Sequence, residues 1–324
     1  MDASKLAARI SELDRQRRER AEKLRPMLAL QAHAAPVTAT VAAVDGGLLH
    51  DELHGLNVTL VRAMAAVMRF NAGRLEMTSY FPESNVEPKL FWDFHDAEME
   101  EFRNKHSLYR ILEEVSLGVR VLEQVRPKFL LMHGSLVPQY VDKPREGSTS
   151  YLLYQQVVSE YEKLFRLSQS LDCPVLGIVE DSRGTRVSRE CSDSCPDTVL
   201  LSYVLREQEC TPDFSYAQNP QEHPVLKTFR PGDASKLRLF YVCTAARDRP
   251  VRVEYYDYGL NSRGLAGLVL GLCGFSKDYG MPSPIVEADL AARLDHGWLA
   301  SLKAELSATQ TDLLMEKRRN RRPF

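Results

Sequence analysis

Ionisable side chains stand directly after three apolar, β-rich runs of the sequence. In open α/β sheets, such strand ends are where binding and catalytic sites form. Oxygen and imidazole ligands gathered at one edge suit Mg²⁺ or Mn²⁺. Two such ions clamp the attacking and leaving oxygens in phosphodiester cleavage. The candidates are Asp45 after residues 37–44, His133 after 128–132, and the pair Glu180-Asp181 after 174–179.

Carboxylates within two predicted helices extend this set. Glu113 and Glu114 lie in an otherwise apolar stretch, where a buried carboxylate is costly unless it is paired or bound to a metal. Glu287 and Asp289 lie near the start of a C-terminal helix. Each candidate also has an ordinary structural interpretation: a turn at 45–47, solvent-facing glutamates at 113–114, a core histidine at 133, or an acid in a helix first turn at 289.

The elements that would position these residues indicate an α/β fold. Three leading strands joined by short turns predict antiparallel pairing, and the later β–α–β units predict parallel, right-handed crossovers. A mixed sheet flanked by helices follows. The expected helices are 4–30, 96–126, 150–171, 199–205 and 284–307, and the expected strands are 37–44, 57–70, 74–81, 128–132, 174–179, 237–243 and 251–256. Residues 183–222 are polar and irregular.

Composition sets the class of protein and its organisation. The 324 residues are 44% hydrophobic and 27% charged, which is typical of globular proteins and excludes collagen-like, coiled-coil or wholly disordered chains. We expect a helical extension at 1–35, a main domain at 36–310 and a basic tail at 311–324. The net charge is −2, so nucleic acid would have to be bound by local patches. The tail supplies one such patch, with Lys317, Arg318, Arg319, Arg321 and Arg322 as candidate DNA-binding residues.

Cysteine usage and hydropathy bear on the compartment. The six cysteines include no CxxC pair, so free thiols in a reducing compartment are favoured over a zinc site at Cys191, Cys195 and Cys210. The start of the chain is charged, and the longest apolar run, Gly264 to Ser276, is too short to span a bilayer. We expect a cytoplasmic protein with no membrane partner.

In strand order and in several short motifs, the chain resembles the NurA family of DNA-end-processing nucleases, which have a ribonuclease H-like fold. The matching stretches span roughly 37–300. They are Val41-Ala42-Ala43-Val44-Asp45-Gly46-Gly47, Leu130-Leu131-Met132-His133-Gly134-Ser135-Leu136, Val175-Leu176-Gly177-Ile178-Val179-Glu180-Asp181-Ser182, Arg252-Val253-Glu254-Tyr255-Tyr256 and Met281-Pro282-Ser283-Pro284-Ile285-Val286-Glu287-Ala288-Asp289.

The resemblance implies a metal-dependent deoxyribonuclease. Its catalytic and metal-binding residues would be Asp45, Glu114, His133 and Asp289, with Mn²⁺ or Mg²⁺ as cofactor. It also implies DNA as a partner, a homodimer, and association with a HerA-type hexameric ATPase that resects DNA ends. No nucleotide-binding GxxxxGK[ST] or GxGxxG motif is present, so energy for translocation would come from that partner.

The sequence departs from the family pattern at three positions. His133 stands where the family usually has Asp, Asp289 where it has His, and Glu180 where it has Lys. Two interpretations follow: an inactive DNA-binding or scaffold subunit, or an exchange of Asp and His across one metal centre that preserves the number of ligands.

The basic tail gives a first prediction. Deleting residues 317–324 should weaken DNA binding and reduce the salt dependence of the binding constant by up to about four in the log–log slope, because each neutralised phosphate adds roughly 0.9. Filter binding at several salt concentrations measures this, and replacing the five bases by Gln at unchanged length separates charge from length. If the tail instead contacts the ATPase, DNA affinity will not change and complex formation will fall.

Overall fold

The computed structural model describes residues 3–94, 99–274, 276 and 278–306, with the backbone alone for 99–104. Its helices are α1 (Ala3–Leu28), α2 (Met99–Gln124), α3 (Thr149–Ser170), α4 (Arg186–Glu190), α5 (Asp197–Val204), α6 (Pro231–Ala234), α7 (Ser262–Leu272), α8 (Ser283–Ala292) and α9 (Gly297–Leu306). Its strands are β1 (Leu30–Gln31), β2 (Ala39–Glu52), β3 (Leu56–Asn71), β4 (Arg74–Phe81), β5 (Lys89–Phe94), β6 (Phe129–His133), β7 (Val175–Val179), β8 (Glu209–Cys210), β9 (Phe214–Ser215), β10 (Leu237–Val242) and β11 (Val251–Tyr256).

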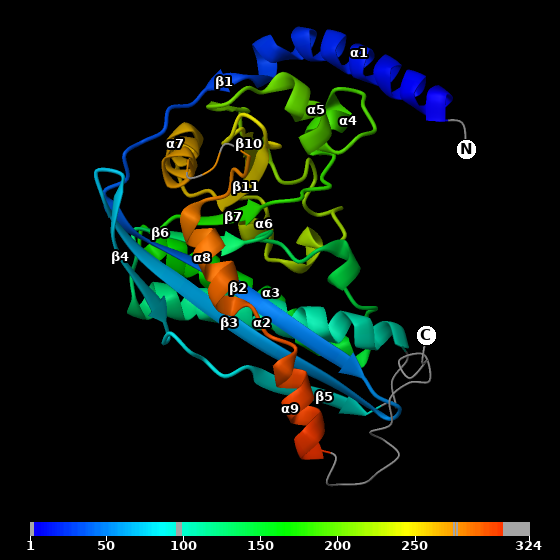
Figure 1. The fold of residues 1–324 in the computed structure, drawn as a ribbon, viewed down its shortest axis with the longest axis vertical. Coiled ribbons are helices and arrows are strands. Elements are labelled where there is room, and N and C mark those ends of the chain that lie inside the picture. Colours follow the sequence, from blue (N-terminus) through cyan, green and yellow to red (C-terminus); the bar gives the residue numbers. More distant parts are fainter. Residues whose placement is uncertain (1–2, 95–98, 275, 277, 307–324) are drawn as a thin grey trace.

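One mixed sheet organises the molecule (Figure 1). Its strand order is β1-β8-β10-β11-β7-β6-β2-β3-β4, with β5 on β3 and β9 on β10. The pairs β2–β6 and β6–β7 are parallel, and the other pairs are antiparallel. The antiparallel leading strands followed by parallel crossovers confirm the predicted ribonuclease H-like mixed sheet flanked by helices.

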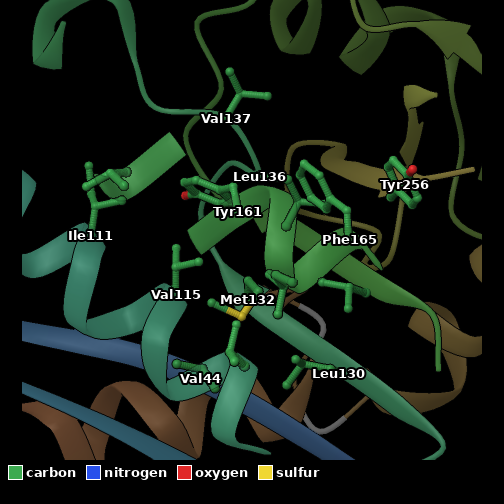
Figure 2. Close-up of a cluster of buried hydrophobic side chains, with 14 of the residues drawn as sticks. Val44, Ile111, Val115, Leu130, Met132, Leu136, Val137, Tyr161, Phe165 and Tyr256 are labelled. Atoms are coloured by element: carbon green, nitrogen blue, oxygen red, sulfur yellow. The ribbon is translucent and has the colours of Figure 1, made fainter. Parts of the chain in front are cut away.

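Helices cover both faces of the sheet, and alternation along β2 assigns each side chain to a face. Ala42 and Val44 pack into the cluster formed with α2 and α3, while Val41 and Ala43 pack into the cluster formed with α7 and α8. Figure 2 shows part of the first cluster, in which Val44, Val115, Leu130 and Met132 lie together beneath Tyr161 and Phe165. The first half of β2 and the adjacent strand β6 are thereby held between two packed layers.

Helix α1 lies along α4 and α5 at one end of the molecule, far from α9 at the other (Figure 1). Its second half is anchored where Ala21 and Leu28 join a buried cluster with Leu201 and Val204 of α5. Its first half is exposed, with Leu6 at 57% and Ile10 at 58% of their full accessibility.

The structure corrects two expectations about these elements. Residues 45–47 are not a turn, because β2 continues to Glu52 and pairs with β3 throughout. The single helix expected at 284–307 is two helices. The backbone at Arg293 is extended, Arg62 donates hydrogen bonds to the carbonyls of Ala292 and Arg293, and Asp295 accepts from the amide of Gly297 to start α9.

Among the elements that were not foreseen, two are longer than five residues. The first is β5, which pairs with residues Leu56 to Val61 of β3. The second is α7, formed by most of the apolar run that begins at Gly264 and buried against the sheet. Within the described part of the chain, no helix has the length and hydropathy needed to cross a membrane.

The packing of α7 gives a second prediction. A Cβ at Gly271 would lie 2.1 Å from the carbonyl oxygen of Ala35, whereas a Cβ at Gly264 in the same helix would have no neighbour closer than 3.6 Å. Gly271→Ala should therefore destabilise the protein by about 1–3 kcal/mol through overpacking. The matched Gly264→Ala should be neutral or stabilising by about 0.5 kcal/mol. Urea unfolding measures the change in stability of both variants. Equal changes would contradict the close approach of Gly271 to the carbonyl oxygen of Ala35.

Candidate metal centre

Asp45 and His133 meet at neighbouring parallel strands. Val44 of β2 is opposite Met132 of β6, so the next residue of each strand lies at the same level. The Asp45 Oδ1 atom is 3.0 Å from His133 Nδ1 and accepts a hydrogen bond of 2.7 Å from the amide of Gly46. Asp45 is only 4% exposed. The two residues therefore form a pair of a buried carboxylate and a partly exposed imidazole.

Glu114 reaches the same place from the α2 face of the sheet. A Cβ at Gly46 would lie 2.4 Å from Glu114 Oε1, so the missing side chain at position 46 is the space that the glutamate occupies. Glu114 is 6% exposed, and its charge interacts with those of Asp45 and His133. Its neighbour Glu113 instead pairs at the surface with Lys89, at 2.7 Å. Only Glu114 of the two faces the site.

Arg110 neutralises Glu114 in this arrangement. One turn earlier on α2, its Nη1 donates to Glu114 Oε1 at 2.7 Å. Burial nevertheless raises the pKa of Glu114 from 4.5 to about 7, because desolvation and the charge of Asp45 outweigh the attraction of Arg110 and His133. The site thus holds a glutamate that exchanges a proton near neutral pH.

His133 connects this cluster to Glu180, four ångströms further along the sheet edge. Its Nε2 lies 4.0 Å from Glu180 Oε2. Burial alone would lower the pKa of His133, but the hydrogen bond and charge of Asp45, with Glu114 and Glu180, raise it overall. Tyr279 lies within hydrogen-bonding reach of Glu180, and burial together with that carboxylate raises its pKa to about 12.

A buried network positions the loop that follows His133. Glu254 Oε2 on β11 accepts hydrogen bonds from Ser135 Oγ at 2.8 Å and from the amide of Leu136 at 2.9 Å. Arg252 donates to the other Glu254 oxygen at 2.8 Å, and Tyr161 donates to the carbonyl of Ser135 at 3.1 Å. Two elements, β11 and α3, therefore hold the loop that directly follows His133, through a largely buried hydrogen-bond network.

The structure does not bring Asp289 into contact with these residues. It lies in the second turn of α8 rather than the first, is half exposed, and pairs with Arg293 at 3.3 Å. Among the described residues, no three His, Cys, Asp or Glu side chains are arranged as ligands of one ion. The basic residues Lys317, Arg318, Arg319, Arg321 and Arg322 lie outside the described residues.

Sequence reasoning missed the contributions of three residues, Arg110, Arg252 and Glu254. Arg110 precedes Glu114 by four residues, the spacing at which opposite charges pair on a helix, and that spacing was the available signal. Glu254 and Arg252 belong to a motif that the sequence analysis cited but gave no role. Only the folded structure shows that their strand passes beneath the His133 loop.

Comparison with known proteins identifies the family of the chain. The NurA domain family matches residues 39–294 of the chain. The chain belongs to the NurA family. Family membership covers the whole segment from β2 to α8, and so includes all four residues expected at the metal centre.

Solved NurA structures share the fold. The NurA nuclease from Sulfolobus solfataricus is similar over 95% of this chain and 94% of its own length, with a TM-score of 0.66 and 14% identity. NurA bound to dAMP and manganese is similar over 95% and 96%, with a TM-score of 0.63 and 12% identity. A search of curated proteins gave no match.

The buried glutamate gives a third prediction. Folded protein holds the Glu114 proton that unfolded protein releases, so stability falls as pH rises from about 4.5 to 7. Glu114→Gln removes that loss. It should be more stable than the wild type at pH 8 by up to about 3 kcal/mol, with the difference vanishing near pH 4.

Glu113→Gln is the matched control, since it removes only a surface ion pair worth about 0–1 kcal/mol. Denaturant unfolding of the three metal-free proteins at pH 4 and 8 measures the effect. A Glu114→Gln variant that is less stable than the wild type at pH 8 would show that the pair with Arg110 outweighs desolvation.

Proposed function

We propose that this protein is a metal-dependent deoxyribonuclease that processes DNA ends. The observation that carries the proposal is the convergence of Asp45, His133 and Glu114, from three different elements, where the middle of β2 lies beside the carboxyl end of β6 in a NurA-family chain. Buried carboxylates that face one another are costly, and proteins retain them chiefly where chemistry needs them.

The donor groups suit Mn²⁺ or Mg²⁺ in kind. Asp45, Glu114 and His133 would hold the ion, as two carboxylates and one imidazole, although in this structure Glu114 is paired with Arg110 and the three are not arranged as ligands of one ion among the described residues. When bound, the ion lowers the pKa of water and stabilises charge that develops on the phosphate. Arg110 balances Glu114 in the absence of a cation and is placed to bind a phosphate oxygen once the glutamate has another partner. A solved NurA structure containing manganese and dAMP supports the choice of ion and ligand.

Two residues compete for the fourth position. We propose Asp289, on the family pattern, with the Asp and His exchanged between positions 133 and 289. Glu180 is the second candidate, because its carboxylate lies 4.0 Å from His133 while that of Asp289 pairs with Arg293.

Partners follow from the family resemblance. We propose a HerA-type hexameric ATPase as the source of translocation energy, DNA as substrate, and a homodimer as the working unit. Leu6 and Ile10, exposed on the first half of α1, supply part of an apolar surface for self-association. Six free cysteines are consistent with a cytoplasmic location.

A non-catalytic DNA-binding or scaffold subunit is the second candidate function. The pairing of Glu114 with Arg110 and of Asp289 with Arg293 favours it, since each pair occupies a carboxylate that a cation would need. In that case the His133, Asp289 and Glu180 departures mark loss of the metal rather than exchange of ligands.

A nuclease assay on linear DNA with Mn²⁺, with and without the cognate ATPase, separates the two. We expect cleavage that Asp45→Asn reduces by at least about 100-fold. Asp172→Asn, the same change at an exposed carboxylate paired with Lys128, should stay within about twofold. An inert wild type with ATPase and Mn²⁺ present would favour the scaffold.

The same assay assigns the fourth position. If Asp289 is the ligand, Asp289→Asn should lower activity at limiting Mn²⁺ and recover at high Mn²⁺, while Glu180→Gln should not. The opposite result would assign Glu180. Loss in both variants would show that the two carboxylates act together.

A further inference from the structure

A pocket lies on the far side of β7 from Asp45. Its volume is about 450 Å³, within the range of about 300–1,000 Å³ that holds small ligands. Its walls come from the segment after β7, from residues 216–218 after β9, and from β11. The side chains that carry the argument below are Arg186, Arg189, Tyr216, His223 and Arg252.

The pocket is lined by three arginines and one carboxylate. Glu190 pairs with Arg186 across one wall. Arg252 is 7% exposed, pairs with buried Glu254, and places its guanidinium 4.9 Å from the centre of the Tyr216 ring. Arg189 is exposed, and within the described residues its side chain has no ion pair or hydrogen bond. The lining therefore carries more positive than negative charge, and the guanidinium of Arg189 is available to bind a ligand.

His223 adds a neutral donor. Its Nδ1 accepts hydrogen bonds from the amides of Val225 and Leu226, at 3.3 and 3.1 Å, so the neutral ring carries its proton on Nε2. Burial, and then the charge of Arg252, lower its pKa, which keeps the ring neutral. Its plane stands at 85° to that of Tyr216. A planar arginine fork beside a fixed N–H donor is suited to oxygens of a phosphate.

The pocket is linked structurally to the candidate metal centre. Arg252 in its wall binds Glu254, and Glu254 holds Ser135 and Leu136 in the loop after His133. Residue 184 in another wall follows Glu180 by four positions. A chain of nucleotides that reaches the metal centre would therefore find this basic pocket close to its path.

We propose that this pocket binds the phosphate group of a nucleotide, at a site separate from the carboxylate cluster, with Arg189, Arg186 and His223 as its contacts. The phosphate belongs either to a free mononucleotide or to the backbone of a DNA strand. Assigning it to a nucleotide rests on the proposed nuclease function, whereas binding of phosphate itself does not.

Calorimetry in EDTA tests the proposal on the full chain, because chelation removes any contribution of a bound metal. The probes are dAMP, inorganic phosphate and a short single-stranded oligothymidine without terminal phosphates. Arg189→Gln should weaken binding of dAMP or of the oligonucleotide about tenfold. Arg183→Gln, the same change at an exposed arginine outside the pocket, should alter it by less than about twofold.

The probes separate the sources of the phosphate. An effect of Arg189→Gln on dAMP alone assigns a free nucleotide, and an effect on the oligonucleotide assigns a DNA strand. Affinities that are unchanged in Arg189→Gln, equally reduced in both variants, or too weak to measure for all three probes overturn the proposal. Since no cleavage is measured, loss of nuclease activity would not produce any of these results.

Discussion

Two carboxylates buried within one small volume are the constraint to which the surrounding structure responds. Asp45 and Glu114 repel each other in a region from which solvent is largely excluded, and neither would remain there unaided. Arg110 offsets one charge and His133 the other, while the amide of Gly46 donates to Asp45. The absent side chain at Gly46 lets the two acids approach from opposite faces of the sheet. The backbone of β2, helix α2 and strand β6 each contribute a group that reduces the repulsion between them.

This repulsion also explains why residues far from Asp45 and Glu114 help to hold the site. His133 can balance Asp45 only if its ring is held in direction, and the loop after it is held by Glu254. Glu254 is itself a buried charge that needs Arg252. Each charged group is thus stabilised by another, from Asp45 through His133 and Glu254 to Arg252. This series of groups extends across the sheet from β6 past β7 to β11. A conservative substitution of Glu254 or Arg252 is therefore expected to affect the site by changing the orientation of His133, not by removing a direct contact with Asp45 or Glu114.

The sequence allowed much of this to be predicted, for identifiable reasons. The β2, β6 and β7 strands were predicted because apolar runs end abruptly at polar residues, and their shared edge brought Asp45, His133 and Glu180 together. Glu114 was assigned over Glu113 through the family resemblance, and the structure turns it toward Gly46. The continuation of β2 past Asp45 was missed because two glycines suggest a turn when the partner strand is unseen. The break before α9 depends on the long-range hydrogen bonds of Arg62, which no local pattern reveals, whereas the pair of Asp289 with Arg293 has the i,i+4 spacing that the sequence does show.

Strand β3 has a further consequence, since its outer edge is shared by β4 along one stretch and β5 along another. A strand of 16 residues left open along that edge would offer a continuous row of backbone donors and acceptors to other chains. Division between two partners replaces it with two short outer strands of 8 and 6 residues, which carry charges such as Arg74, Glu76, Lys89 and Asp93. The outer edge of the long hairpin that bears Asp45 is thereby paired within the chain over residues 56–61 and 65–71, which leaves those backbone groups unavailable to a strand of another molecule.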